Sequence, residues 1–399
     1  MISEFIMRIQ RLQARLQEKR IDGCMITQNV DIYYFAGSMQ SGYLFVPSAG
    51  EALFFVRRSV VRAQGEAAVQ VEPLGSFRSF GDRLADTYRA IFDDAASSSR
   101  KLRLAAEFDV LPVQQLQRLE AVLPGAEWVD GSMLIRELRM IKSAAELACI
   151  REAARVIDLA FNDAVQTLRP GTTELELMSR IELFIRRQGH LGIMRMRGYN
   201  QEVITGMVGA GEAAAMPTYF DGPAGGQGLS AASPQSAGRR PIQPNEPILI
   251  DIGCCIEGYV IDQTRTAVIG TLQDELVFAY DTSEQIIRSV EERLKPGTIC
   301  EQLYMHSLQM AHKAGLSDHF MGYGDDQVKF LGHGIGLEID ELPVLAKGFS
   351  YPLQPGMVIA IEPKFTFPGR GVVGIENSYV ITENGYEKLT VTQEGLIVL

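Results

Sequence analysis

The sequence predicts a mixed fold in two parts, an α/β domain over residues 1–135 and an α+β domain over residues 136–399. Helix and strand patterns alternate along the first part, as is typical of α/β proteins. The region from about residue 145 onward contains two similar halves, each with helices followed by a strand hairpin. If the two halves pack about a pseudo-two-fold axis, their hairpins converge. A chain of 399 residues is long enough for two such domains.

The amino-terminal domain is predicted from short apolar runs that are separated by helical patterns. Apolar residues at helical spacing predict helices over residues 1–20, 80–92 and 112–123. The strands predicted from apolar runs are 21–27, 102–106 and 127–129, with a hairpin of residues 43–46 and 52–56. This domain contains no catalytic motif and no histidine, so we expect it to shape a partner surface or a pocket wall.

The two halves of the carboxy-terminal domain repeat the same order of signals. In the first half, an amphipathic helix over residues 144–168 ends at Arg169-Pro170-Gly171-Thr172, where a second helix begins. In the second half, Lys295-Pro296-Gly297-Thr298 separates two helices in the same way. Each half then has an acidic residue eight positions after a glutamine: Asp251 after Gln243, and Glu362 after Gln354.

The first predicted hairpin carries two aspartates on apolar strands. Its strands flank a turn at Glu257-Gly258, and they contain Asp251 and Asp262. A carboxylate on a buried strand costs several kcal/mol unless it is paired or binds a metal ion. No lysine lies on either strand, and only Arg265 follows at the end. The two aspartates are therefore candidates for metal ligands.

The second hairpin and a glycine-rich segment add three more candidates. Glu362 lies on one strand, the chain turns at Pro368-Gly369, and Glu376 lies on the returning strand. His333 stands between glycines, which let the backbone bend and bring the ring close to a site. One histidine and four acids suit two divalent ions, Mn, Fe, Co or Zn, held about 3.5–4 Å apart and bridged by carboxylates.

Composition limits the classes of partner and compartment. A net charge of −11 argues against nucleic acid or an anionic membrane as the main partner. No apolar stretch reaches the roughly 18 residues of a membrane span. Five cysteines without metal-type spacing suggest reduced, buried thiols in the cytoplasm. Adjacent Cys254 and Cys255 either fill core volume or serve as metal or redox ligands.

The Gly-, Ala-, Ser- and Pro-rich segment over residues 207–244 is either a substrate loop or a flexible connection.

These motifs resemble the pita-bread-fold metallopeptidases, which include aminopeptidase P, prolidase and methionine aminopeptidase, and their non-peptidase relative creatinase. The resemblance covers essentially the whole chain, with a creatinase-type amino-terminal α/β domain before a pita-bread catalytic domain. The matching motifs are ILIDIG with Asp251, YVIDQTRT with Asp262, GHGIGLE with His333, AIEP with Glu362 and GIENSYVIT with Glu376. The resemblance implies two divalent ions at these residues, a bridging water as nucleophile, and Glu362 as the acceptor of its proton. It also implies a homodimer.

The chain departs from prolidase-like members at two positions that carry histidine in the family. Thr218-Tyr219 and Asp340-Glu341 stand in the corresponding motifs, where the family histidines help to bind substrate and to transfer protons. The resemblance therefore makes these four residues candidates for substrate binding. Asp340 favours a substrate that presents an amine, a guanidinium or a neutral donor. Arg265 either holds a substrate carboxylate or pairs with a nearby acid.

Three functions are compatible with the sequence. The first is a metal-dependent hydrolase of the Xaa-Pro aminopeptidase or dipeptidase type, in which a metal-bridging water attacks the amide of a small peptide. The second keeps the metal ions but acts on a non-peptide C–N bond, or by other metal chemistry, in a small metabolite. The replacements at Thr218 and Asp340 are its motivation. The third is a non-catalytic scaffold. Five polar groups on apolar segments argue against it, because burying them costs free energy that a scaffold has no need to spend.

Overall fold

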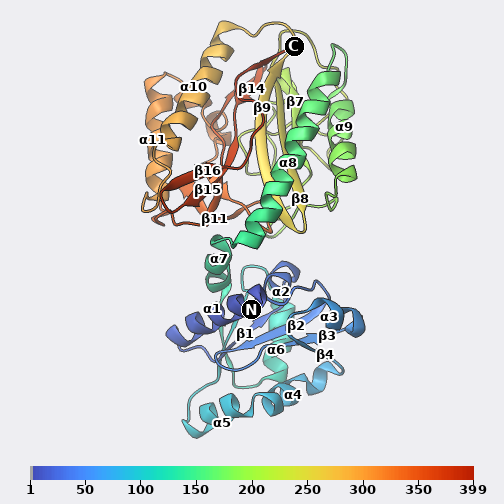
Figure 1. Ribbon diagram of the computed structural model, residues 1–399, viewed down its shortest axis with the longest axis vertical. Coiled ribbons are helices and arrows are strands. Elements are labelled where there is room, and N and C mark those ends of the chain that lie inside the picture. The colour runs from blue at the N-terminus through green and yellow to red at the C-terminus, as the bar shows by residue number, and fades with distance from the viewer. Residues whose placement is uncertain (1–2) are drawn as a thin grey trace. The chain divides into compact units, whose positions relative to one another are not determined.

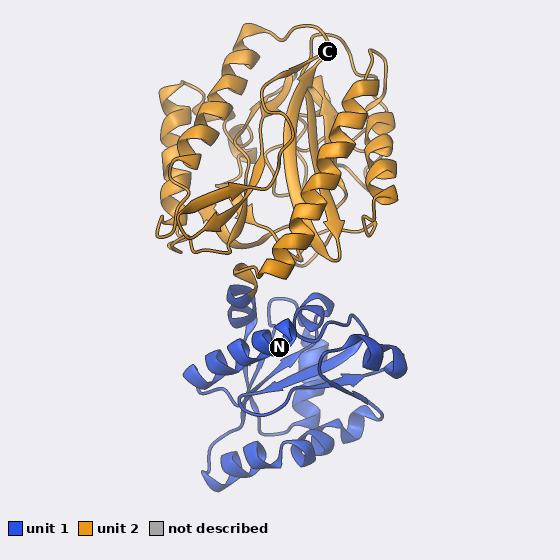
Figure 2. Ribbon diagram, in the orientation of Figure 1, with its two compact units in different colours: residues 1–138 blue, residues 139–399 orange. Residues whose placement is uncertain are grey.

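The computed structural model describes residues 3–399, and the chain divides into two compact units (Figure 2). Unit 1 is Met1–Leu138 and unit 2 is Arg139–Leu399, so the division falls three residues after the predicted one at 135. Helix α7 (Ser132–Met140) runs across the division. The predicted helix over residues 1–20 is α1 (Glu4–Glu18), and the first two residues of the predicted range lie outside the described part.

Unit 1 is built on a six-stranded sheet packed with helices, which confirms the predicted α/β class (Figure 1). Its spatial order is β4-β3-β2-β1-β5-β6, in which β1, β5 and β6 are parallel and β2 is antiparallel to both neighbours. The strands are β1 (Gly23–Ile26), β2 (Gly42–Pro47), β3 (Leu53–Val56), β4 (Gln70–Pro73), β5 (Arg103–Ala106) and β6 (Glu127–Asp130). The remaining helices are α2 (Asn29–Ala36), α3 (Val60–Glu66), α4 (Phe80–Thr87), α5 (Arg89–Ser97) and α6 (Val113–Val122).

Unit 1 buries its apolar residues on the sheet. Phe45, Phe55 and Leu104 are fully buried there, and each comes from a strand that the sequence predicted. The β-branched and aromatic residues of these runs favour extended backbone, and burial against the covering helices stabilises the sheet. Strand β4 and helices α2 and α3 were not predicted, because their segments are too short to show a clear period.

Unit 2 contains two pairs of helices, one pair in each half. They are α8 (Ala144–Thr167) and α9 (Glu174–Arg187), then α10 (Asp274–Glu291) and α11 (Cys300–Lys313). Capping boxes begin both helices of the first pair: Ser143 with Glu146, and Thr173 with Glu176. In Figure 1, α8 and α9 flank one group of strands, and α10 and α11 flank the other. The helix ends beside the two Pro-Gly-Thr loops, and the start of α8, confirm the predicted boundaries to within a few residues.

The strands of unit 2 form three sheets. One has the order β17-β9-β8-β7, another the order β11-β10-β12-β15-β16, and β13 pairs with β14. The bounds are β7 (Gly206–Ala210), β8 (Ile248–Ile256), β9 (Tyr259–Val268), β10 (Phe330–Gly334), β11 (Glu341–Ala346), β12 (Val358–Ile361), β13 (Lys364–Phe367), β14 (Gly371–Gly374), β15 (Asn377–Thr382), β16 (Gly385–Lys388) and β17 (Ile397–Val398). The first predicted hairpin is β8–β9, and its turn residues Glu257 and Gly258 have φ values of 50° and 91°.

The internal repeat is visible in matching backbone hydrogen bonds. The amide of Gly171 donates to the carbonyl of Ile242 at 2.9 Å, and the amide of Gly297 donates to the carbonyl of Leu353 at 2.8 Å. Gly171 and Gly297 also share a left-handed φ of 89°. In both halves, therefore, the loop between the helices binds the chain just before the glutamine that leads to an acidic strand.

The second predicted hairpin is less regular than the first. Strand β12 pairs with β15, and the chain between them forms the separate pair β13–β14 around the turn at Pro368 and Gly369. Glu362 lies between β12 and β13, and Glu376 lies between β14 and β15. Both acids are thus at the point where one strand pair gives way to the other. The sequence predicted the turn and the two acids but not this break.

The segment over residues 207–244 contains one strand that the sequence did not predict. Strand β7 pairs antiparallel with β8, from Gly206 opposite Ile252 to Ala210 opposite Ile248. Its glycines and alanines have low strand propensity, so the pairing with β8 decides its conformation. The rest of the segment is irregular and lines a cavity that is described below.

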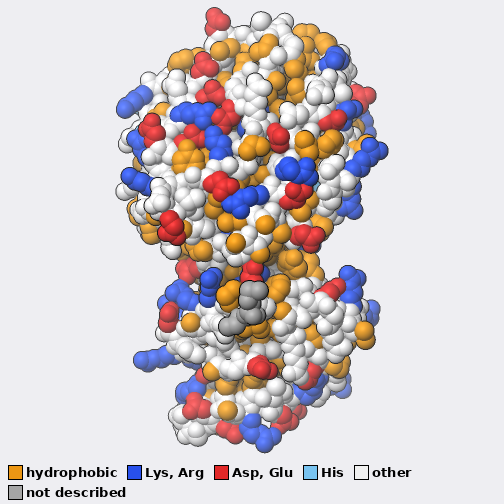
Figure 3. Space-filling view, viewed as in Figure 1, with side chains coloured by type: hydrophobic (Ala, Val, Ile, Leu, Met, Phe, Trp, Pro, Cys, Tyr) orange, Lys and Arg blue, Asp and Glu red, His pale blue; other side chains and the backbone are white. Residues whose placement is uncertain are grey.

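Surface and thiol features bear on the predicted partners and compartment. Within the described residues, none of the helices is long and apolar enough to cross a membrane. Figure 3 shows acidic and basic side chains interspersed over the face that is drawn. No disulfide bond is found among the described residues, and four of the five cysteines are buried, as predicted.

Candidate metal centre

The two aspartates of the first hairpin lie on the same face of the β8–β9 pair. Asp251 is opposite Thr264, and Asp262 is opposite Gly253. Because side chains alternate between the faces of a strand, residues 251 and 253 share one face, and so do residues 262 and 264. Cross-strand partners also lie on a common face, so the register brings the two carboxylates to one side.

The second hairpin meets the first at Thr264 and Glu376. The amide of Glu376 donates to the carbonyl of Thr264 at 3.1 Å. The hydroxyl of Thr264 donates to Glu376 Oε2 at 2.7 Å. These bonds tie the two halves together at the acids, which is the convergence that the repeat predicted.

His333 reaches the same place from the middle of a sheet. Strand β10 lies between β11 and β12, and its pairing with β11 is irregular on both sides of His333. The glycines beside His333 also permit close packing. A Cβ atom at Gly332 would lie 2.1 Å from the carbonyl oxygen of Ala360, and one at Gly334 would lie 2.2 Å from that of Leu342. The glycines therefore have a second role that the sequence did not predict, close packing against the neighbouring strands, beside the irregular backbone at His333.

The contacts of His333 indicate which of its ring nitrogens is available to a metal ion. Its Nδ1 lies 3.1 Å from Asp340 Oδ1 and 3.2 Å from the carbonyl oxygen of Gly334. Both oxygens are acceptors, so Nδ1 carries the proton and Nε2 is the ring nitrogen available to a metal ion. Nε2 lies 3.7 Å from Glu362 Oε1. Burial by itself lowers the pKa of His333, but nearby carboxylates, Asp340 foremost, outweigh burial and raise it.

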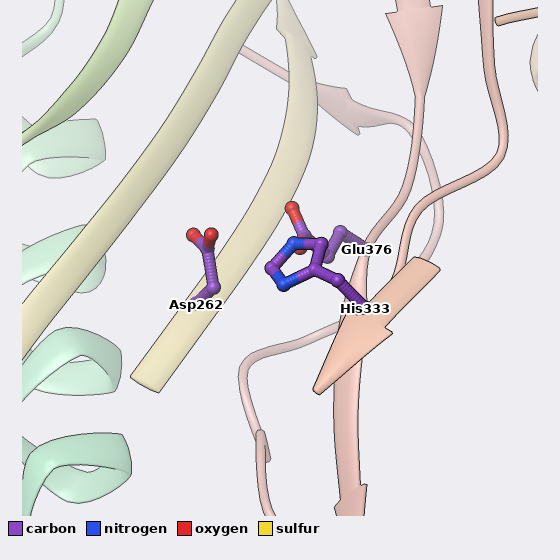
Figure 4. Close-up of side chains that lie close together, drawn as sticks. All are labelled: Asp262, His333 and Glu376. Atoms are coloured by element: carbon purple, nitrogen blue, oxygen red, sulfur yellow. The ribbon is translucent and has the colours of Figure 1, made fainter. Parts of the chain in front are cut away.

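Three of the expected ligands form a set that fits one divalent ion (Figure 4). Asp262, His333 and Glu376 each offer a ligand atom within 4.8 Å of the others, and their side chains point toward a common space. Glu376 Oε1 is buried and has no hydrogen-bond partner among the described residues. An unpartnered buried carboxylate oxygen costs free energy unless a cation binds it. Two carboxylates and an imidazole suit Mn, Fe, Co or Zn.

The remaining expected ligands, Asp251 and Glu362, contact a cation that the sequence analysis overlooked. Lys364 Nζ lies 3.0 Å from Asp251 Oδ2, 2.5 Å from Glu362 Oε2 and 3.3 Å from Glu376 Oε2. Lys364 begins β13 of the second hairpin, whereas the strands of the first hairpin contain no lysine. The signal was present in the motif AIEPK, since residues two apart on extended chain point to the same side.

Burial and mutual repulsion govern the protonation of this cluster. Burial raises the pKa of three of its acids: Asp251, Asp262 and Glu362. For Asp262, neighbouring carboxylates add to the effect of burial. Burial alone lowers the pKa of Lys364, but the three carboxylates around it raise the pKa well above its usual value. Lys364 is therefore an ammonium cation, and the acids need cations in order to ionise together.

A cavity opens beside the centre, and two of the residues expected to bind substrate line it. Asp251, Asp262, His333 and Glu362 form part of its wall. Thr218 and Asp340 line it as well, together with Asp221, which the sequence analysis did not single out. The hydroxyl of Thr218 is buried and has no hydrogen-bond partner among the described residues. Tyr219 lines a neighbouring cavity, and its hydroxyl accepts a hydrogen bond from Gln235.

Two of the expected substrate residues serve the fold instead. Arg265 is fully buried, and its guanidinium donates to four carbonyl oxygens and to Asn377 Oδ1. These bonds occupy its donors and argue against a role in holding a substrate carboxylate, and no ion pair of Arg265 is found among the described residues. Glu341 is also buried, and it binds Arg139 at 2.5 Å and Lys142 at 3.0 Å. Glu341 is therefore removed from the substrate-binding set.

Other groups considered from the sequence lie outside the centre. The ring of His190 is buried, and its Nδ1 accepts the backbone amide of Cys255 at 3.0 Å. His190 therefore does not supply a missing active-site histidine. Burial raises the pKa of the thiols of Cys254 and Cys255 to about 12 and about 11. Thiols held neutral in this way are poor metal ligands, so filling the core is the role that fits.

Comparisons with known proteins agree with the resemblance. A model of metallopeptidase family M24 matches residues 148–383, and one of the creatinase/prolidase N-terminal domain matches residues 8–141. The chain is 29% identical over 394 residues to an uncharacterised peptidase of Bacillus subtilis, YqhT, with 98% of this chain and 100% of the relative covered. It is 28% identical over 402 residues to an Xaa-Pro dipeptidase of Lactobacillus delbrueckii subsp. lactis, with 98% and 99% covered.

Solved structures show the same architecture over the whole chain. The Xaa-Pro dipeptidase from Bacillus anthracis superposes with a TM-score of 0.81 at 25% identity, and 99% of this chain and 100% of that one are covered. The M24 model alone matches more than half of the chain. The fold predicted from the motifs is thereby confirmed, and the chain belongs to metallopeptidase family M24, an enzyme with a creatinase/prolidase N-terminal domain before its pita-bread catalytic domain.

Proposed function

We propose that this enzyme hydrolyses the amide bond of small Xaa-Pro peptides with the help of a divalent metal ion. The observation that carries the proposal is the convergence of Asp262, His333 and Glu376 at the wall of a cavity. A divalent ion held by these residues supplies a Lewis acid for the substrate carbonyl and an acidic water as nucleophile. The metal is Mn, Co, Fe or Zn, all of which accept mixed oxygen and nitrogen ligands.

The residues of the chain supply positioning and proton transfer. Glu362 faces His333 and lines the cavity, so we assign it the role of accepting the proton of the attacking water. The pKa of Glu362, raised by burial, brings its basicity closer to that of a general base at neutral pH. The unpartnered hydroxyl of Thr218 offers a hydrogen bond to the substrate where prolidase-like members carry histidine.

A second candidate function is hydrolysis of a C–N bond in a cationic small metabolite. Asp221 and Asp340 both line the cavity, and the pKa of Asp221 is raised by burial and by the charge of Asp340. A positively charged group of the substrate would relieve this repulsion. An amine or guanidinium is therefore favoured there, either on a peptide or on a metabolite.

Hydrolysis of a dipeptide panel tests the two candidates against each other. We expect the protein to release proline from Xaa-Pro dipeptides, with Lys-Pro and Arg-Pro preferred to Glu-Pro, and to lose this activity in a chelator and regain it with added Mn²⁺ or Co²⁺. Dipeptides without proline, such as Lys-Ala, serve as controls. No proline release with any metal, together with turnover of cationic amides or amidines, would favour the second candidate.

Replacing Asp340 by asparagine is expected to weaken metal binding. Asp340 accepts from His333 Nδ1, and carboxylates that orient a metal-binding histidine are typically worth about 10–100-fold in metal affinity or activity. Competition with a chromogenic chelator measures the change. Asp221→Asn is the matched control, because Asp221 lines the same cavity without an ion pair to His333. Equal metal affinity in the two variants would contradict the role given to Asp340.

The proposal also includes a homodimer in the cytoplasm. The lack of disulfide bonds among the described residues and the net charge of −11 are compatible with a reducing compartment and with solubility. Light scattering on the purified protein would give the mass of the assembly, and a value equal to the chain mass of 44.0 kDa would exclude the dimer.

A further inference from the structure

Lys364 occupies a position in the acidic cluster that is built to hold it. Its side chain is 1% exposed, and its ammonium group contacts one oxygen each of Asp251, Glu362 and Glu376. An ammonium group has three N–H donors, so three carboxylates satisfy it completely. A buried lysine is tolerated only when it is paired and hydrogen-bonded in this way.

The strand opposite leaves room for the lysine. Lys364 pairs with Gly374 across β13 and β14. A Cβ atom at position 374 would lie 2.7 Å from Lys364 Cγ and 2.6 Å from the carbonyl oxygen of Pro363. A side chain there would displace the stem of the lysine. The glycine therefore supports the buried conformation independently of the acids.

The ligand atoms divide into two groups that share Glu376. Lys364 contacts Glu376 Oε2, whereas Oε1 of the same carboxylate has no partner among the described residues. That free oxygen belongs to the residue that groups with Asp262 and His333. One divalent ion fits this second group. Asp251 lies outside this second group, and the lysine, 3.0 Å from its Oδ2, neutralises it instead.

We propose that Lys364 takes the place of one of the two divalent ions, so that this enzyme binds a single ion per chain. The inference rests on the proposed metal-dependent function. Four carboxylates meet at the centre, and the charge of a single divalent ion would not balance their negative charge. The ammonium group of Lys364 supplies a further positive charge. Unlike a metal ion, it cannot be removed by a chelator.

Metal stoichiometry tests the proposal without an activity assay. The metal-free full-length protein is titrated with Mn²⁺, and bound metal is measured by equilibrium dialysis and by electron paramagnetic resonance. We expect one ion per wild-type chain, with the spectrum of an isolated Mn²⁺ ion. In Lys364→Met we expect two ions per chain and the spectrum of a spin-coupled pair. Lys364→Arg keeps the positive charge and is expected to bind one ion.

A lysine outside the centre provides the matched control. Lys388 is also held by two carboxylates, at 2.7 Å from Glu291 and 2.6 Å from Glu394. Lys388→Met is expected to bind one ion, as the wild type does. Two spin-coupled ions in the wild type overturn the inference even if a variant fails to fold. One ion in a folded Lys364→Met also overturns it, as does a second ion in Lys388→Met.

The same experiment separates failure of the inference from failure of the proposed function. If the wild-type protein binds two ions and hydrolyses Xaa-Pro dipeptides, the proposed function is supported and the inference is contradicted. If the wild-type protein binds no divalent ion, both the proposed function and the inference are contradicted. One ion per chain without release of proline supports the inference and counts against the proposed hydrolysis of Xaa-Pro peptides.

Discussion

Replacing His333 by alanine is expected to lower hydrolysis by roughly a thousandfold or more, because it removes the one nitrogen ligand of the candidate centre. Loss of a single group that stabilises charge in a transition state typically costs about 10²–10³ in rate, and loss of the ion removes the nucleophile as well. The measurements are kcat/KM on the best dipeptide of the panel and bound metal per chain. Both are expected to fall together, whereas the folded structure is retained.

His312 supplies the control for this prediction. It is an exposed histidine on α11, outside the candidate centre. His312→Ala is expected to keep the wild-type metal content and rate. A His333→Ala protein that binds metal and turns over substrate like His312→Ala would show that the imidazole is not a ligand. Adding free imidazole to His333→Ala further distinguishes a missing ligand from a disturbed fold, since partial recovery requires an intact site.

Replacing Glu341 by glutamine is expected to destabilise the protein by about 3 kcal/mol at neutral pH, since removing one partner of a buried ion pair typically costs about 3–5 kcal/mol. Glu341 is 6% exposed and binds both Arg139 and Lys142. Lys142 is 1% exposed and would lose this carboxylate. Arg139 keeps Glu338 at 2.7 Å, which places the expected value at the lower end of the range. Urea denaturation monitored by circular dichroism measures the free energy of unfolding.

The destabilisation should depend on pH in a defined direction. Burial by itself raises the pKa of Glu341, but Arg139 and Lys142 outweigh burial and lower the pKa to about 2. Because the pKa in the folded state lies below the unfolded value of about 4.3, the contribution is complete above that value and is lost as the pH falls toward about 2. The difference between wild type and Glu341→Gln should therefore shrink steadily below about pH 4.

An exposed ion pair serves as the control for Glu341. Glu387 pairs with Arg151 at 2.7 Å, and both side chains are nearly half exposed. Glu387→Gln is expected to change the free energy of unfolding by less than about 1 kcal/mol, because solvent screens such pairs. If the two variants were equally stable, the ion pairs of Glu341 would not stabilise the fold. The exclusion of Glu341 from the substrate-binding residues would then need another explanation.

Local patterns in the sequence were sufficient for much of the fold. The turn at Glu257-Gly258 requires positive φ and predicted the β8–β9 hairpin. The repeated Pro-Gly-Thr loops predicted the helix pairs, and the repeated acids predicted that two hairpins meet. These features depend on residue spacing within one element or on a comparison between two halves, and both can be read along the chain.

The binding partners of the charged side chains could not be predicted from the sequence. Arg265 follows an expected metal ligand, yet it turns into the core and binds backbone carbonyls. Glu341 was expected to bind substrate, yet it pairs with Arg139 of α7 and with Lys142 of the loop that follows α7. Neither outcome follows from neighbouring residues, because each depends on which distant segment packs alongside.

By itself, the sequence determined which four acids and which histidine are the candidate ligands, and that the acids belong to the hairpins of two related halves. The tertiary structure decided what lies between those acids. The break between β12 and β13 points Lys364 into the cluster, and Gly374 on the opposite strand leaves space for its side chain. Periodicity specifies which face of one strand a residue occupies, whereas the number of cations at the centre depends on how two hairpins meet.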